Sequence, residues 1–189
     1  IRFGVADLRV FKSRASTGIR GIKLMDGDEV VSISVIHGIE ATPDERAAYL
    51  KRASQDRNQV EDETAESDEE EAATGNVVLT EERFAEMAKY EEFLLAVTSR
   101  GFGKRTSTYE YRATNRGGSG IWNMKLSKKN GEIVGSFNVQ DTDEAMLVTN
   151  GGQIIRMPVK DVRFVGRQSQ GVTLFRIEAA IIREVGGEE

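Results

Sequence analysis

Short runs of apolar or alternating residues along this chain predict β-strands. Such runs occupy residues 30–36, 93–98, 133–139 and 145–149, and they are rich in Val, Ile, Leu and Phe. They are too short for typical helices, and β-branched and aromatic residues favour strands. Turn sequences that tolerate positive φ lie between them: Asp26-Gly27, Asn130-Gly131 and Asn150-Gly151-Gly152.

Residues 40–92 have a different composition, rich in Glu, Ala, Gln and Lys, which favour helices. The sequence Thr42-Pro43-Asp44-Glu45 combines a capping hydroxyl, proline at the first helical position and glutamate at the third. It predicts a helix over residues 43–54.

A second helix is expected after Thr80, whose hydroxyl can cap it, with Phe84, Met87 and Ala88 on one face. The acidic run 61–73 between the two helices has no apolar periodicity. It is expected to be mobile.

One pattern occurs three times: arginine, three small or polar residues, glycine and a β-branched residue. Its copies are residues 14–19, 116–121 and 167–172, and a basic residue follows each glycine five positions later. The second and third copies are 51 residues apart and the first and second 102, so an insertion separates the first two. Units of this size with several short strands are typical of a β-propeller-like ring.

The repeats divide the chain into four parts, and the fold class expected is all-β with a mostly helical acidic insertion. The parts are a partial blade (1–39), the insertion (40–92), a blade (93–140) and the last blade with a C-terminal tail (141–189). The opening residues 1–3 match residues 104–106 inside the second repeat. The chain is therefore expected to be a fragment of a larger ring.

Charge is unevenly distributed along the chain. The whole chain has a net charge of -5, but residues 40–93 hold 17 acidic and 6 basic residues, a net of -11. This leaves 14 acidic and 20 basic residues elsewhere, a net of +6. The repeats are therefore basic, which favours a nucleic-acid partner.

Composition excludes several kinds of site. With no Cys and a single His, His37, this chain alone cannot form disulfides, thiolate metal sites or multi-histidine sites. Residues 98–106 do not form a nucleotide-binding loop, because Thr98 and Arg105 stand where Gly and Ser or Thr are required. No apolar run is long enough to cross a bilayer and no signal peptide is evident, so a cytoplasmic protein without a cofactor or metal is expected.

Several ordered motifs resemble the last blades of the DNA gyrase A subunit family. They are residues 98–106, Tyr111, 115–120, 130–131 and 166–172, and the resemblance covers residues 1–39 and 93–185. It implies a six-bladed β-pinwheel with a basic rim that bends DNA, of which this chain holds about two and a half blades. The family's Gln-Arg-Arg-Gly-Gly box belongs to a blade absent here, and residues 40–92 lie outside the common pattern. The A subunit of topoisomerase IV, with related blades, is the close alternative.

The resemblance implies a non-catalytic DNA-wrapping module that supports ATP-dependent negative supercoiling. Implied partners are double-stranded DNA, the gyrase B protein and a second gyrase A protein in an A2B2 holoenzyme of the bacterial nucleoid. The active-site tyrosine and the ATPase, which uses ATP and Mg²⁺, are expected elsewhere in the holoenzyme. The alternative from another class is a propeller that serves only as a protein-docking platform.

The candidate DNA contacts are basic residues in the repeats, because arginine and lysine neutralise phosphates without reading sequence. They are Lys12, Arg14, Lys23, Lys104, Arg105, Arg116, Lys125, Lys128, Lys129, Arg156, Arg167 and Arg176. For Arg14, Arg116 and Arg167 there are two equally weighted interpretations, a DNA contact and a structural hydrogen bond to the neighbouring blade's loop. Lys23, Lys125 and Arg176 precede an aliphatic residue in a strand and are expected to point outward.

Other prominent residues have structural interpretations. Gly18, Gly120 and Gly171 are expected in tight turns or close blade contacts, and Trp122 and Phe137 in core or blade-edge packing. The acidic insertion is either a tolerated loop or a regulator that competes with DNA for the basic rim or contacts another protein of the holoenzyme.

Overall fold

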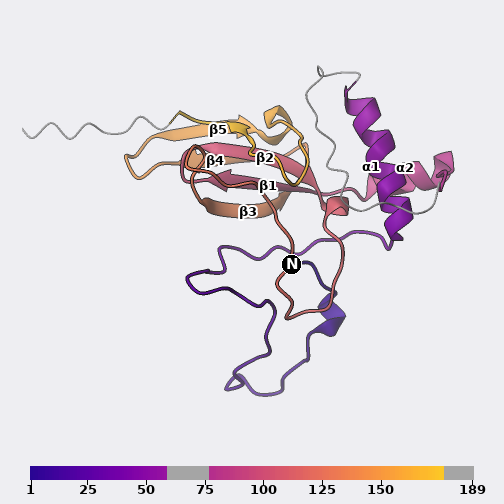
Figure 1. Ribbon diagram of the computed structural model, residues 1–189, viewed down its shortest axis with the longest axis horizontal. Coiled ribbons are helices and arrows are strands. Elements are labelled where there is room, and N and C mark those ends of the chain that lie inside the picture. Colours follow the sequence, from indigo (N-terminus) through magenta and orange to yellow (C-terminus); the bar gives the residue numbers. More distant parts are fainter. Residues whose placement is uncertain (59–76, 177–189) are drawn as a thin grey trace, which may run out of the picture.

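The computed structural model describes residues 1–58 and 77–176 (Figure 1). The helices in these residues are α1 (Pro43–Asn58) and α2 (Glu81–Lys89). The strands are β1 (Phe93–Thr98), β2 (Phe102–Ser107), β3 (Ile133–Val139), β4 (Glu144–Val148), β5 (Ile154–Pro158) and β6 (Val172–Thr173). Three short 3-10 helices are η1 (Val5–Asp7), η2 (Thr108–Glu110) and η3 (Val159–Asp161).

The strands form two antiparallel sheets, which confirms the all-β class of the repeats. The larger sheet has the order β3-β1-β2-β6, and the smaller pairs β4 with β5. β6 belongs to the third repeat (141–189) but pairs with β2 of the second repeat (93–140), with Val172 opposite Gly103. A Cβ at Gly171 would lie only 2.7 Å from the carbonyl oxygen of Gly103. The third repeat therefore adds a strand to the sheet of the second repeat, and the two backbones approach closely at Gly171 and Gly103.

Three of the four predicted strands are confirmed. β1 and β3 occupy the predicted residues, and β4 begins and ends one residue earlier than predicted. The turns are also confirmed, since Gly131 and Gly152 have φ of 76° and 80°. The equivalent Gly18, Gly120 and Gly171 have positive φ as well, in agreement with their interpretation as turn residues.

The predicted strand 30–36 is wrong, because this segment of the first repeat (1–39) forms no ladder and leaves Ile33 87% exposed. Equivalent bridges join Arg2 to Ala113 and Arg105 to Phe164, and they align the first and second repeats. In this alignment residues 30–36 correspond to β3. Among the strands of the described residues, none pairs with residues 30–36.

The main hydrophobic core passes through the junction between the second and third repeats. Its buried members are Leu95, Val97, Val139, Ala145, Val159 and Val162. Full burial of such aliphatic side chains contributes about 1.5–3 kcal/mol each for the larger ones. The two repeats therefore share a core.

The insertion forms the two predicted helices. At the start of α1 the Thr42 hydroxyl accepts from the Glu45 amide at 3.2 Å, and Glu45 accepts from the Thr42 amide at 2.8 Å. Arg83 also donates to Glu45, and this hydrogen bond holds the pKa of Glu45 below its usual value. Thr80 accepts from the Arg83 amide at 3.2 Å and caps α2 as predicted. The acidic run 61–73 lies outside the described residues.

The helical pair packs against the second repeat, to the right of the sheet in Figure 1. Tyr109 from η2 joins Tyr49, Ala53 and Met87 in a second core. The Tyr49 and Tyr109 rings meet edge to face at 5.1 Å, and the Tyr109 hydroxyl donates to the Met87 carbonyl at 3.0 Å. Burial raises the pKa of Tyr109 to about 12, so this hydroxyl stays protonated at neutral pH. The insertion thus shares a core with the blade.

Candidate nucleic-acid interface

One series of candidate arginines joins each repeat to the repeat before it. Arg116 Nη1 donates to the Arg20 carbonyl at 3.3 Å, and Arg167 Nη1 donates to the Trp122 carbonyl at 3.0 Å. Arg20 and Trp122 are equivalent, because each follows its repeat's glycine by two positions. The hydrogen bond expected in the structural alternative is therefore present for Arg116 and Arg167, whereas their contact with DNA stays a prediction. Arg14, the first member of the series, is exposed.

A second series joins each repeat to the repeat after it. Arg2 Nη1 donates to the carbonyls of Thr108 and Tyr111, at 2.9 and 3.1 Å, around η2. Arg105, its equivalent, donates to the Lys160 carbonyl in η3 at 3.5 Å and pairs with Asp141. The Arg105 side chain is only 12% exposed, so this charge connects repeats and is poorly placed for DNA. Arg156, the third member, is 68% exposed and pairs with Glu144.

The assignment of Lys104 as a DNA contact is wrong. Lys104 is fully buried, and its Nζ donates to the carbonyls of Gly166 and Arg167 at 2.8 and 2.5 Å. An ammonium that replaces its hydration with carbonyl oxygens inside the protein cannot neutralise a phosphate on the surface. Lys104 therefore ties β2 to the loop of the third repeat.

Replacing Lys104 with methionine is expected to lower the free energy of unfolding by about 2–3 kcal/mol, because the partly buried carbonyls of Gly166 and Arg167 lose a charged donor. Denaturant unfolding measures this change. Lys128→Met, at an exposed position, should stay within about 0.5 kcal/mol of the unaltered protein. Equal stability of the Lys104→Met variant and the unaltered protein would contradict the structural role.

An exposed basic turn lies at the junction between the second and third repeats and is held by hydrogen bonds of one buried side chain. This lysine turn, residues 125–131, presents Lys125, Lys128 and Lys129 to solvent. Its buried Asn130 accepts from the Ser127 amide at 2.7 Å and donates to the carbonyls of Lys125 and Gln170, at 3.0 and 3.2 Å. Gln170 belongs to the third repeat, so one amide side chain closes the turn and fixes it to the neighbouring blade. Three cations are thus presented on an ordered backbone.

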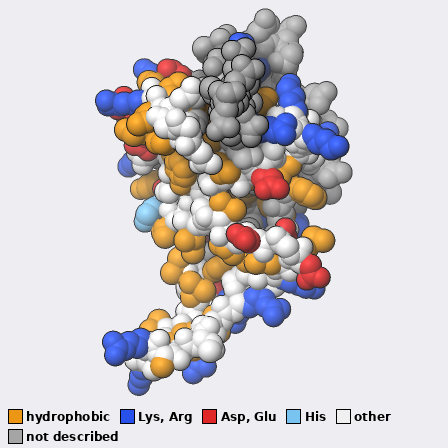
Figure 2. Space-filling model, turned by 90° about the vertical axis from the view of Figure 1, so that its left-hand side faces the viewer, with side chains coloured by type: hydrophobic (Ala, Val, Ile, Leu, Met, Phe, Trp, Pro, Cys, Tyr) orange, Lys and Arg blue, Asp and Glu red, His pale blue; other side chains and the backbone are white. Residues whose placement is uncertain are grey.

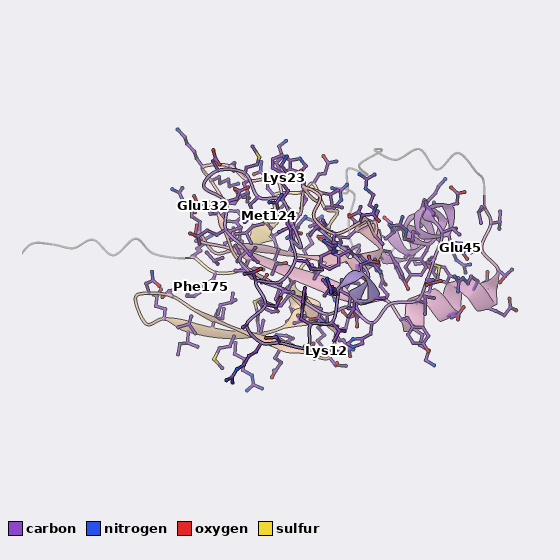
Figure 3. All side chains as sticks on the ribbon, turned by 90° about the horizontal axis from the view of Figure 1, so that it is seen from below. Lys12, Lys23, Glu45, Met124, Glu132 and Phe175 are labelled. Atoms are coloured by element: carbon purple, nitrogen blue, oxygen red, sulfur yellow. The ribbon has the colours of Figure 1, made fainter. Side chains whose placement is uncertain are left out.

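The remaining candidates are exposed and spread over the surface. They are Lys12, Lys23 and Arg176. The Lys23 and Lys125 amides make equivalent contacts, to the carbonyls of Gly118 at 2.9 Å and Ser169 at 3.2 Å. Both side chains are exposed as expected, but the expected reason is wrong, because Leu24 and Leu126 are 41% and 43% exposed and lie outside the strands. Figure 3 separates Lys12 from Lys23. Lys and Arg side chains also gather at the lower tip in Figure 2, formed by the first repeat. The cations therefore follow several repeats and form no single patch.

Two aromatic residues expected in core or blade-edge packing are exposed. Trp122 is 75% exposed and Phe137 is 43% exposed, so neither is a core residue. Trp122 is equivalent to Thr173 of β6, which pairs with the preceding repeat. His37 is a surface residue, with its ring 3.6 Å from Glu92.

Metal sites and membrane-spanning helices were also sought among the described residues. Within residues 1–58 and 77–176 there is no group of three or more His, Cys, Asp or Glu placed to hold a metal ion. Neither α1 nor α2, the helices of the described part, is long and apolar enough to cross a membrane.

Comparison with known proteins places these repeats in a family. The family model described as "DNA gyrase C-terminal domain, beta-propeller" matches residues 1–37, 92–140 and 143–179. The DNA gyrase A subunit of Granulibacter bethesdensis is 49% identical over 179 residues, which are 90% of this chain and 19% of that protein. The DNA gyrase A subunit of Rickettsia bellii is 48% identical over 178 residues, 94% of this chain and 19% of that protein.

A solved DNA gyrase A C-terminal domain aligns with a TM-score of 0.45 and 28% identity, over 46% of this chain and 30% of that one. The chain spans about a fifth of the length of the curated relatives it matches. Its identity to them extends over most of its own length, and the family model covers all three repeats. The chain belongs to the DNA gyrase A subunit family and matches its C-terminal β-propeller domain.

Proposed function

We propose that this chain is a non-catalytic DNA-binding and DNA-wrapping module of a gyrase A protein. The observation that carries the proposal is the lysine turn, whose three exposed cations stand on a backbone fixed by Asn130 across a repeat junction. Lysines presented in this way neutralise phosphates and release counterions whatever the base sequence. Membership of the gyrase A family agrees with this use of the surface.

The proposed contact set is smaller than the sequence predicted. Its core is Lys125, Lys128 and Lys129, with Lys12, Lys23 and Arg176 as exposed additions. Arg14 and Arg156 are exposed end members of the two arginine series. Bending 20–30 base pairs costs on the order of 1–6 kcal/mol, which several phosphate contacts can offset.

The module would act within a larger enzyme. We propose that it wraps double-stranded DNA in an A2B2 holoenzyme, with the gyrase B protein and a second gyrase A protein, in the bacterial cytoplasm. DNA cleavage and ATP hydrolysis, with ATP and Mg²⁺, are assigned to other parts of that holoenzyme. Wrapping would present a second DNA segment for strand passage and so support negative supercoiling.

A titration of labelled duplex DNA at several salt concentrations tests the proposal. The intact gyrase A protein carrying this sequence should bind more tightly than the protein lacking it, with a steeper fall of log K against log salt. Duplexes of different sequence should bind alike. Equal affinity and slope with and without the segment would instead favour a protein-docking platform.

A further inference from the structure

The helical insertion reaches both junctions between repeats. Near the start of α1, Arg46 Nη1 donates to the Tyr109 carbonyl at 3.5 Å. The adjacent Thr108 carbonyl accepts from Arg2 of the first repeat at 2.9 Å. Near the other end, Arg57 Cζ lies 4.1 Å from the ring centroid of Phe164 in the third repeat. At about 1.5 Å per residue, α1 spans roughly 16 Å between these two arginines.

Arg57 is held in place from the helix side. Its Nη2 lies 2.5 Å from Oε2 of Glu91, whose side chain is only 5% exposed. The Tyr49 hydroxyl donates to the same carboxylate oxygen at 2.8 Å. Because the Glu91 side chain is buried, removal of Arg57 would leave its charge unpaired inside the protein, which is costly.

The other face of Arg57 meets an aromatic pair that crosses the junction. Phe93 of β1 and Phe164 of the third repeat pack edge to face, with centroids 5.8 Å apart at 84°. Arg57 Cζ is 5.6 Å from the Phe93 centroid, so one guanidinium lies against rings from both repeats. A partly desolvated cation over aromatic faces is attracted more strongly than an exposed one. Rotation of the third repeat would break this contact.

We propose that the helical insertion is a brace that fixes the orientation of the third repeat relative to the second. α1 is its rigid member, anchored to the second repeat by the Tyr49–Tyr109 contact, and Arg57 is its contact with the third. The pitch between blades sets the path of DNA along the rim. That last consequence rests on the proposed function, whereas the brace itself does not.

Hydrogen–deuterium exchange of the intact gyrase A protein, without DNA, tests the brace. The double variant Arg57→Met/Glu91→Gln removes both charges and leaves no unpaired ion. Peptides over 103–107 and 160–166 report the junction, because the Arg105 amide donates to the Arg163 carbonyl at 3.1 Å and the Val165 amide to the Arg105 carbonyl at 3.0 Å. Exchange there is expected to become at least tenfold faster, with the β1–β3 amides unchanged.

Arg52→Met is the matched control. Arg52 lies on the same helix and stacks on Phe84 at 4.0 Å, but it pairs with Glu81 inside the insertion. Its loss should leave junction exchange unchanged. Phe164→Leu, which keeps the Arg57–Glu91 pair, should reproduce the junction-selective effect.

Unchanged junction exchange in the double variant would overturn the brace. An equal rise in Arg52→Met, or a uniform rise that includes β1 and β3, would overturn it as well. DNA takes no part in these measurements. Absence of DNA binding by the unaltered protein would therefore count against the proposed function alone.

Discussion

Simultaneous replacement of Lys125, Lys128 and Lys129 by glutamate is expected to weaken duplex DNA binding about a hundredfold at 0.1 M salt. If each lysine neutralises one phosphate, the slope of log K against log salt should flatten by about 2.7, or 0.9 per contact. The loss should be similar for duplexes of different sequence, because phosphates carry no base identity. Fluorescence anisotropy titrations over a range of salt concentrations measure both quantities.

A charge reversal on the insertion, of two lysines in place of three, supplies the comparison. Lys51→Glu and Lys89→Glu change exposed lysines of α1 and α2 and should alter affinity far less. A comparable loss in the two proteins would mean that net charge alone governs binding. Unchanged affinity in the lysine-turn variant would remove this turn from the DNA contacts.

Tyr109→Ala is expected to lower the free energy of unfolding by about 3–5 kcal/mol. Tyr109 is 2% exposed and lies between the blade and both helices, so truncation leaves a cavity in the core they share. Denaturant unfolding followed by circular dichroism measures the change. Faster proteolysis of the helical pair should accompany it, because the insertion loses its main apolar contact.

Tyr109→Phe separates the ring from its hydroxyl. It removes only the hydrogen bond to the Met87 carbonyl and is expected to cost about 1 kcal/mol. A loss below about 1 kcal/mol for Tyr109→Ala would contradict the packing of the insertion on the blade.

Sequence patterns correctly predicted the helices and strands that are determined by residues close together in the chain. The capping box at Thr42 and Glu45 and the apolar runs of β1 and β3 each lie within a few residues, and each was confirmed. The segment 30–36 has an equally good apolar pattern but forms no strand. A strand needs a partner, and the pattern of one segment cannot show whether that partner is present.

The candidate site was harder to predict because its charges act between repeats. Lys104 resembles a phosphate contact in sequence, yet its acceptors lie 62 and 63 residues away. For Arg116 and Arg167 the periodicity was informative, because equivalent positions make equivalent contacts across each junction. Repetition of a basic residue therefore indicated a blade contact as readily as a DNA contact.

Two important residues were missed. Asn130 was interpreted only as part of a turn, although its burial and its bond to Gln170 fix the lysine turn. Its place between two lysines and a glycine was the available signal. Arg57 gave no signal, because its aromatic partners lie 36 and 107 positions further along the chain.

The most direct test of the account is the topology of relaxed, nicked DNA circles sealed by ligase while the intact gyrase A protein is bound. Wrapping around the basic blades predicts a shift in linking number that grows with protein concentration and is lost with the glutamate lysine-turn variant or the protein lacking this segment. Sealed circles with the linking number of free DNA, at protein concentrations that saturate binding, would contradict it.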